Sequence, residues 1–157
     1  MRLEYFQLID RIVDLDLERR IIRAETTVPK ISTIFDGHFP GYPLMPGVLL
    51  IEIMAQTSGW LIVAEKKFSR MPFLAAVKEA KLRSFVSPGA KLEVKATLIH
   101  DGSGFARTES EIQSDGKLVC NAETTFRVVD FPNVEFRRHV EEAAVAIALP
   151  IDVPSHG

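Results

Sequence analysis

Residues 46–68 read PGVLLIEIMAQTSGWLIVAEKKF, and this stretch decides the fold. Four polar residues interrupt an otherwise apolar run before the charged end at residues 65–67. From Gly47 to Phe68 the chain would form a helix of roughly 33 Å, at 1.5 Å per residue. A membrane span needs about 20 mostly apolar residues with few charges, so we predict a buried helix and no membrane span. Because this helix is apolar nearly all round, the rest of the chain must wrap it.

The segments on either side of this helix have the composition of β-strands. Residues 6–15 and 19–28 are rich in Ile, Val, Leu and Thr, and a polar turn separates them. After the helix, turns rich in Pro, Gly, Asp and Ser divide the chain into four further expected strands, at 73–86, 92–99, 105–113 and 118–129. Strands joined by tight turns are antiparallel neighbours. We therefore predict an α+β fold, in which a curled antiparallel sheet wraps one long central helix.

The end of the chain has a different pattern. Alternation over residues 118–129 places one set of side chains on a single face, namely Leu118, Cys120, Ala122, Thr124, Phe126 and Val128. The sequence Asp-Phe-Pro-Asn then breaks the strand, and residues 134–149 have the pattern of a helix. We divide the chain into a domain at residues 1–129 and a C-terminal extension at 130–157, helical at first and flexible after it.

Composition excludes several classes of protein. The chain has 157 residues, which suits one domain, and a formal net charge of -2, which does not favour nucleic-acid binding through a basic field. A single cysteine, Cys120, forms no internal disulfide and no site with several thiolates. The first residues contain no apolar signal-peptide core. We expect a soluble cytoplasmic protein.

The candidate chemistry lies in and just after a loop before the central helix. Three prolines and three glycines lie between Gly37 and Gly47, and they shape the backbone without regular structure. His38 lies inside this loop. Glu52 and Gln56 follow on the helix, four residues apart and therefore on one face. Without further context these residues also have structural interpretations. His38 could be a structural loop residue, and Glu52 could be a solvated carboxylate or the ion-pair partner of Arg83.

Residues 38–56 contain the pattern HFPGxPxMPGVLxxExxAQ, which resembles the signature of the FabZ-type 3-hydroxyacyl-ACP dehydratases. The resemblance extends more weakly from residue 6 to residue 128, about four-fifths of the chain, and includes the basic segment AKLRSFVSPG at 80–89. It implies the hotdog fold, a curled antiparallel sheet around a long helix. It also implies dehydration of (3R)-3-hydroxyacyl-ACP to trans-2-enoyl-ACP in fatty acid biosynthesis.

The resemblance assigns roles to individual residues. His38 takes the position of the catalytic histidine and Glu52 that of the catalytic carboxylate. The amide of Gly47 would polarise the thioester carbonyl, the carbonyl of Val48 would hold His38 in its useful tautomer, and Gln56 would orient Glu52. FabA-type relatives, which also isomerise the double bond, carry aspartate where this chain has Glu52, so dehydration alone is favoured.

The resemblance also implies partners and no cofactor or metal. The histidine of one subunit faces the carboxylate of the other in this family, so we expect a homodimer, which can assemble into a trimer of dimers. The substrate is an acyl group on the phosphopantetheine of acyl carrier protein. Four residues are candidates for the acyl tunnel, namely Ile53, Trp60, Phe73 and Leu74. Three basic residues are candidates for carrier-protein docking, namely Lys78, Lys81 and Arg83. Ordinary core packing and a solvated strand face are the respective alternatives.

Both ends of the chain depart from the family pattern. The usual opening helix is missing, Ser32-Thr33-Ile34 replaces the usual Asn-Glu pair, and about 28 residues follow Val129. A paralogue specialised for lipid A or very-long-chain acyl groups is one interpretation of these differences.

Two other functions stay open: a hotdog acyl thioesterase, and a non-catalytic acyl-binding subunit. The intact His38 loop argues against the first, and the presence of both His38 and Glu52 argues against the second.

Overall fold

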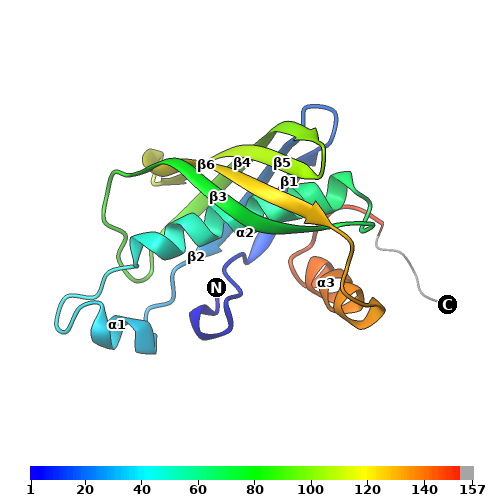
Figure 1. Cartoon of the computed structure of the whole chain (residues 1–157). Helices are drawn as coiled ribbons and strands as arrows, with labels where there is room; N and C mark the ends of the chain where they lie inside the picture. Colours follow the sequence, from blue (N-terminus) through cyan, green and yellow to red (C-terminus); the bar gives the residue numbers. More distant parts are fainter. Residues whose placement is uncertain (153–157) are drawn as a thin grey trace.

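The computed structural model describes residues 1–152, which form one antiparallel sheet with a long helix in its hollow (Figure 1). In chain order the elements are η1 (Leu3–Tyr5), β1 (Arg11–Asp16), β2 (Ile21–Thr27), α1 (Thr33–Gly37), α2 (Gly47–Glu65), β3 (Met71–Leu82), β4 (Lys91–Gly102), β5 (Phe105–Ser114), β6 (Lys117–Val129) and α3 (Val134–Ala146). This is the predicted α+β architecture, with the predicted central helix.

The sheet has six strands in the order β1-β2-β4-β5-β6-β3, and every neighbouring pair is antiparallel. The chain leaves β2 at one side of the sheet, passes through α1 and α2, and enters β3 at the opposite edge. It then forms β4 beside β2 and returns through two hairpins to β6, which pairs with β3. This order leaves β1 and β3 as the two edges of the sheet.

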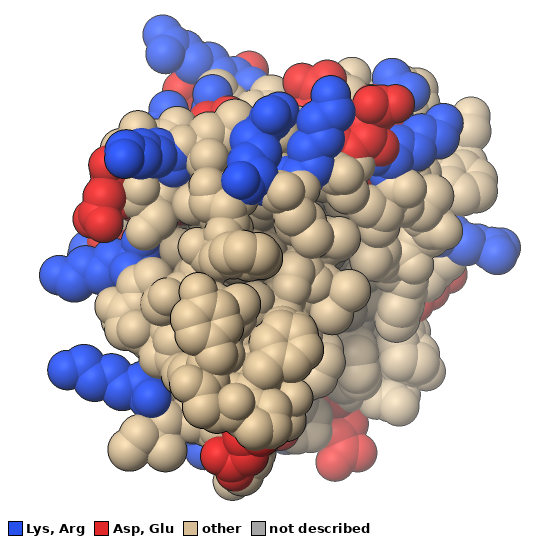
Figure 2. All heavy atoms as spheres, turned by 90° about the vertical axis from the view of Figure 1, so that its left-hand side faces the viewer, with Lys and Arg blue, Asp and Glu red and all other residues tan. Residues whose placement is uncertain are grey.

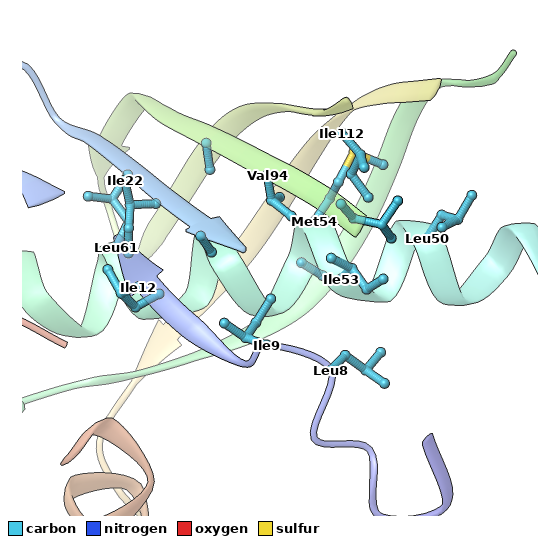
Figure 3. Close-up of a cluster of buried hydrophobic side chains, with 14 of the residues drawn as sticks. Leu8, Ile9, Ile12, Ile22, Leu50, Ile53, Met54, Leu61, Val94 and Ile112 are labelled. Atoms are coloured by element: carbon cyan, nitrogen blue, oxygen red, sulfur yellow. The ribbon is translucent and has the colours of Figure 1, made fainter. Parts of the chain in front are cut away.

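Helix α2 is the centre of the hydrophobic core. Its length and composition alone would allow it to cross a membrane, but 56% of its most apolar window is buried inside the structure, as in the core helix of a soluble protein. The sheet supplies the other half of the core through alternate residues: in β4, Leu92, Val94, Ala96 and Leu98 all point inward. Figure 3 shows this contact, with Ile53, Met54 and Leu61 of α2 meeting Ile22 and Val94 of the sheet.

The first predicted strand begins later than expected. Residues 6–10 are not in a strand, because the chain turns sharply after η1, with Phe6 in the left-handed region at φ 55°. Leu8 and Ile9 are still buried, so their apolar character reflects core packing rather than strand pairing. β1 itself runs from Arg11 to Asp16.

Two other strand details differ from the prediction. β3 ends at Leu82, four residues before the predicted end at residue 86. In β6, the register against β5 shifts between Ile112 and Gln113, and Val119 is buried where alternation predicted Leu118, which is 37% exposed. A β-bulge moves the side chains on one side of it to the other face, so simple alternation fails there.

Helix α3 begins at Val134 as predicted and ends at Ala146, three residues before the predicted end. Asn133 caps its start, since the Asn133 side chain accepts a hydrogen bond from the amide of Phe136 at 2.7 Å. The chain then returns to the sheet, where the amide of Ile12 donates to the carbonyl of Ile147 at 2.8 Å. The flexible end predicted after this helix falls largely on residues 153–157, outside the described part of the chain.

Candidate active site

His38 lies at the C-terminal end of α1, in a loop whose backbone is fixed by hydrogen bonds. Its amide donates to the carbonyl of Ile34 at 3.0 Å, and its carbonyl accepts from the amide of Leu44 at 2.9 Å. Further along the loop, the amide of Met45 donates to Val86, just after β3, at 2.7 Å. The loop is irregular, as the density of Pro and Gly predicted, and it is tied to both α1 and the chain after β3.

Helix α1, which the sequence did not predict, is anchored by Glu4. The hydroxyl of Ser32, the N-cap residue, accepts from the amide of Ile34 and donates to the Glu4 carboxylate at 2.7 Å. This hydroxyl, together with the backbone amide of Thr33, lowers the pKa of Glu4. The N-terminal segment thus holds the helix on which His38 is placed.

The His38 ring is oriented by a single backbone carbonyl. Its Nδ1 lies 2.9 Å from the oxygen of Leu44. A carbonyl only accepts, so Nδ1 carries the proton, and in the neutral ring Nε2 keeps its lone pair as a base. Our sequence interpretation gave this role to Val48, but the ring contacts Leu44 instead. Val48 lies in the first turn of α2, where a carbonyl points along the helix axis.

The start of α2 offers backbone amides close to His38. Pro46 is the N-cap residue and provides no side-chain acceptor, so no side chain caps the amides of the first turn. Gly47 lines the same cavity as His38, and a Cβ at Gly47 would overlap Cδ1 of Leu82 on β3. The absence of a side chain at residue 47 therefore lets β3 approach the helix start closely. The positive end of the helix dipole lies at the same place.

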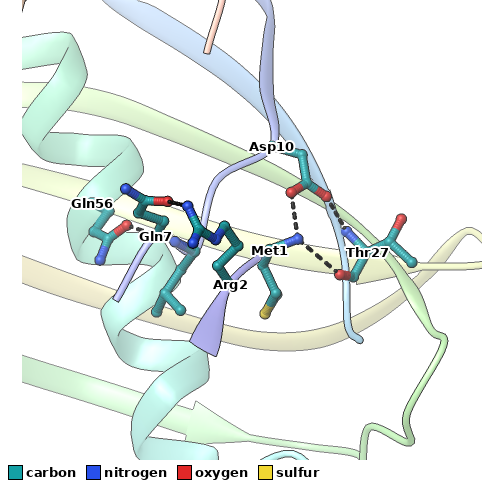
Figure 4. A network of polar contacts seen from close by, with 7 residues as sticks. Met1, Arg2, Gln7, Asp10, Thr27 and Gln56 are labelled. Carbon is teal, nitrogen blue, oxygen red and sulfur yellow. Dashed lines mark hydrogen bonds and ion pairs between the residues drawn. The ribbon is translucent and has the colours of Figure 1, made fainter. Parts of the chain in front are cut away.

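Glu52 is half-buried, one and a half turns into α2, and Gln56 holds it. The Gln56 amide nitrogen donates to the Glu52 carboxylate at 3.1 Å and to the carbonyl of Phe6 at 2.8 Å. The Gln56 oxygen accepts from the amide of Leu8 at 3.2 Å. Figure 4 shows Gln56 beside the N-terminal segment, which Asp10 ties to β2 through the amide of Thr27. The predicted contact between Gln56 and Glu52 is present, while Arg83, the alternative partner of Glu52, donates to Asn121 instead.

His38 and Glu52 open into different cavities of the same chain. A cavity of about 400 Å³ is lined by His38, Gly47 and residues 82–85. A separate cavity of about 610 Å³ contains Glu52 and Gln56. Within one chain the two candidate catalytic groups therefore do not share a cavity.

The larger cavity is mainly apolar and contains three of the four candidate tunnel residues, Trp60, Phe73 and Leu74. The fourth, Ile53, is fully buried in the core between helix and sheet and does not line it, so this assignment is corrected. Sequence reasoning missed two walls of this cavity, the N-terminal residues up to Asp10 and one face of α3. The spacing of apolar residues on the predicted C-terminal helix was a usable signal for the second wall.

The candidate docking residues all lie at or just after β3 and are exposed. Arg83 lines the cavity of His38, whereas Lys78 and Lys81 lie outside it. Figure 2, which shows the side of the molecule with α1 and the His38 loop, has a broad uncharged surface with Lys and Arg side chains along its upper and left margins. The region around the loop therefore has few charged side chains, and most of those at its upper and left margins are basic.

The described residues contain no group of three His, Cys, Asp or Glu side chains placed to hold a metal ion. Cys120 is fully buried in β6, and burial raises the pKa of its thiol to about 11. A buried thiol with that pKa is protonated at neutral pH and is not a nucleophile.

Comparison with known proteins identifies the relatives of this chain. The model of the FabA-like domain matches residues 2–123. The chain is 37% identical over 125 residues to the 3-hydroxyacyl-[acyl-carrier-protein] dehydratase FabZ of Fusobacterium nucleatum, covering 80% of this chain and 88% of the relative. It is 36% identical to the FabZ of Protochlamydia amoebophila, covering 80% and 81%.

Solved structures with low sequence identity share the fold. A putative thioesterase from Ralstonia eutropha, related to phenylacetic acid degradation, superposes with a TM-score of 0.60 at 18% identity, covering 73% of this chain and 81% of that one. At this identity the likeness speaks for the hotdog fold and not for a shared reaction.

Proposed function

Because the chain belongs to the FabA-like domain family, and within it to the FabZ-type 3-hydroxyacyl-ACP dehydratases, we propose that His38 and Glu52 carry out this dehydration. The reaction converts (3R)-3-hydroxyacyl-ACP to trans-2-enoyl-ACP in fatty acid biosynthesis, and we assign it to the cytoplasm. One observation above all supports the role of His38: its Nδ1 donates to Leu44, which leaves Nε2 free to act as a base in a residue that lines a cavity.

The dehydration needs three groups, and the chain offers one for each. Nε2 of His38 takes a proton from carbon 2, and the electron pair of that C–H bond forms the new double bond to carbon 3. Negative charge that builds on the thioester oxygen is stabilised by the amide of Gly47 at the uncapped helix start. The bond between carbon 3 and the hydroxyl oxygen breaks with its electron pair going to oxygen, and the proton that His38 took from carbon 2 passes to this oxygen, so that water leaves and Nε2 is again free. Glu52 accepts a hydrogen bond from the leaving hydroxyl, and Gln56 holds Glu52 in place.

The separate cavities of His38 and Glu52 support a site shared between two chains. β3 is a long edge strand with exposed apolar side chains, among them Phe73, Leu74 and Val77. Such an edge pairs readily with another strand, so a second copy is its expected partner. A two-fold axis at β3 would place the His38 of one chain opposite the Glu52 of the other, and it would create two identical sites.

The basic residues at the border of the His38 cavity fit the other partner, acyl carrier protein. Its pantetheine arm carries a phosphate, and a guanidinium binds phosphate oxygens well. Arg83 lines the cavity and is the one docking candidate close enough to act there. Lys78 and Lys81 are exposed on β3, just before Arg83 in the chain.

The test is hydration of crotonyl-ACP by the purified protein, which runs the reaction in reverse and is followed by loss of enoyl thioester absorbance. We expect activity in the wild type and a loss of about 100-fold or more in His38→Ala, the usual weight of acid–base catalysis. The matched control is His100→Ala, because His100 is an exposed histidine on β4. Release of free thiol without hydration would indicate a thioesterase, and an active His38→Ala protein would overturn the mechanism.

A further inference from the structure

One stripe of α2 forms a continuous wall of the larger cavity. The cavity-lining residues of this helix are Glu52, Ala55, Gln56, Gly59, Trp60 and Val63. They follow the spacing i, i+3, i+4, i+7, i+8 and i+11, which is a single face of a helix. Eleven residues at 1.5 Å each carry this wall roughly 16 Å from the carboxylate. The cavity is therefore elongated along α2, with Glu52 near one end.

One face of α3 forms a facing wall. Its cavity-lining residues are Phe136, His139, Val140, Ala143 and Ala146, followed by Ile147 just after the helix. An apolar stripe of this kind on a helix ordinarily packs against the core of the same protein. Here Phe136 is 37% exposed and Ala143 is exposed, so the stripe meets open space in the cavity instead. On this side of α3, Phe136 and Ala143 thus offer exposed apolar surface to the cavity, whereas Val140 and Ile147 also pack against the core.

The remaining face of α3 fixes the helix to the domain. Ala144 is fully buried, Leu149 just beyond the helix is 5% exposed, and both belong to the main hydrophobic core. The amide of Ile12 on β1 donates to the carbonyl of Ile147. Arg137 and the buried Glu141 form an ion pair at 2.9 Å within α3, which stabilises the helix itself. The core packing of Ala144 and Leu149 and the bond to Ile12 attach α3 to the domain, so that it forms one wall of the cavity.

The position of α3 decides which part of a ligand it would meet. Figures 1 and 3 both place α3 near the half of α2 that contains Leu61, away from Leu50 and the His38 loop. An acyl chain with its reacting carbons at Glu52 would extend along α2 toward α3. The match to the family model ends at residue 123, so α3 lies outside the matched domain.

We propose that α3 closes the distal end of the acyl cavity and that its inner face, above all Phe136 and Ala143, limits the length of the acyl chain. This inference rests on the proposed dehydratase function and adds its chain-length selectivity. Each buried methylene strengthens binding about fourfold, so a side chain that excludes two of them weakens binding of a long substrate by more than tenfold. A short acyl group does not reach α3 and does not meet that side chain.

The experiment compares kcat/KM for hydration of twelve-carbon and four-carbon trans-2-enoyl-ACP. We expect Ala143→Phe, which fills the distal end, to lower the ratio of long-chain to short-chain kcat/KM at least tenfold. Phe136→Ala, which widens the distal end of the cavity, should raise the ratio of long-chain to short-chain kcat/KM. The matched control is Val145→Phe: Val145 is 66% exposed on the opposite face of α3 and does not line the cavity, so the ratio should stay constant.

An unchanged ratio in a folded Ala143→Phe protein, or an equal change in Val145→Phe, would overturn the proposal. Failure of the dehydratase function is distinguished by the wild type, which would then hydrate neither substrate. In that case the only tryptophan, Trp60, reports on the cavity directly. Titration of its fluorescence with dodecanoyl-pantetheine should show weaker binding to Ala143→Phe than to Val145→Phe, and equal affinities would count against a wall at α3.

Discussion

At the scale of single residues, His38 and Glu52 obtain their orientation from neighbours close in sequence. Leu44, six residues after His38, fixes the imidazole tautomer through its carbonyl. Gln56, one helical turn after Glu52, holds the carboxylate and at the same time binds the backbone at Phe6 and Leu8. The loop therefore orients His38 through the Leu44 carbonyl, and the N-terminal segment supports Glu52 through Gln56, whose role can be tested by substitution.

Gln56→Met keeps the size and shape of the side chain but removes all three hydrogen bonds. Each such bond contributes about 0.5–1.5 kcal/mol, so we expect the loss of three to lower the free energy of unfolding by about 1.5–4.5 kcal/mol. We also expect kcat to fall about tenfold with a smaller change in KM, because the Glu52 carboxylate loses its support in the transition state. Denaturant titration and steady-state kinetics measure the two effects.

The control for this variant is Gln113→Met on β5, where the Gln113 amide makes one long contact of 3.5 Å with Glu111. It should change neither stability nor kcat appreciably. A purely structural role of Gln56 would lower stability and leave kcat of the folded protein unchanged, which would contradict the positioning of Glu52.

At the scale of elements, the end of α3 has a feature that limits stability. The amide of Leu149 donates to the carbonyl of Ala144, and that of Ala148 to Val145, which together form a Schellman motif. Ala148 occupies the left-handed position of this motif at φ 55°, where glycine is usual. An L-residue with a Cβ is strained there by about 1–2 kcal/mol.

Ala148→Gly should therefore stabilise the protein. Glycine relieves the strain in the folded state but makes the unfolded chain more flexible, which costs about 0.4–1 kcal/mol. Because the relief of strain is larger, we expect the free energy of unfolding to rise by about 0.5–1 kcal/mol. Denaturant midpoints at equal protein concentration measure it. The control is Ala146→Gly, at the last residue of α3, which should instead lower the free energy of unfolding by about 1 kcal/mol. If both variants were less stable than the wild type, the backbone of Ala148 would not be in the left-handed region in solution.

The elements also show where sequence reasoning succeeds and where it fails. Helix α2 and strand β4 were predictable because a long apolar run and a clean alternation each have one simple structural solution. The segment at residues 6–10 was not, because burial without strand pairing leaves the same apolar signature. The bulge in β6 and the five-residue α1 depend on contacts with β5 and with Glu4, which local periodicity does not contain.

At the scale of the whole molecule, we propose that the active site requires two chains, because His38 and Glu52 line different cavities of one chain. The pattern at residues 38–56 predicted the site residues by resemblance, and the Glu52–Gln56 contact by helical spacing. Residues 38–56 supply part of the lining of both cavities, but the other walls come from the end of β3, the N-terminal segment and α3, which are far apart in sequence and which this pattern does not contain. One folded chain has a complete core, and we infer that it supplies half of each of two sites.

Mixing two inactive variants tests this sharing. We expect His38→Ala and Glu52→Gln to be inactive alone, since each lacks one group in every site. Random exchange makes about half of the dimers mixed, and each mixed dimer has one intact site of two, so activity should return to roughly a quarter of the wild-type value. The reverse control mixes wild type with the double variant, in which every mixed dimer has two defective sites, so the wild-type activity should fall by about half. If both groups acted within one chain, the first mixture would stay inactive and the second would lose nothing.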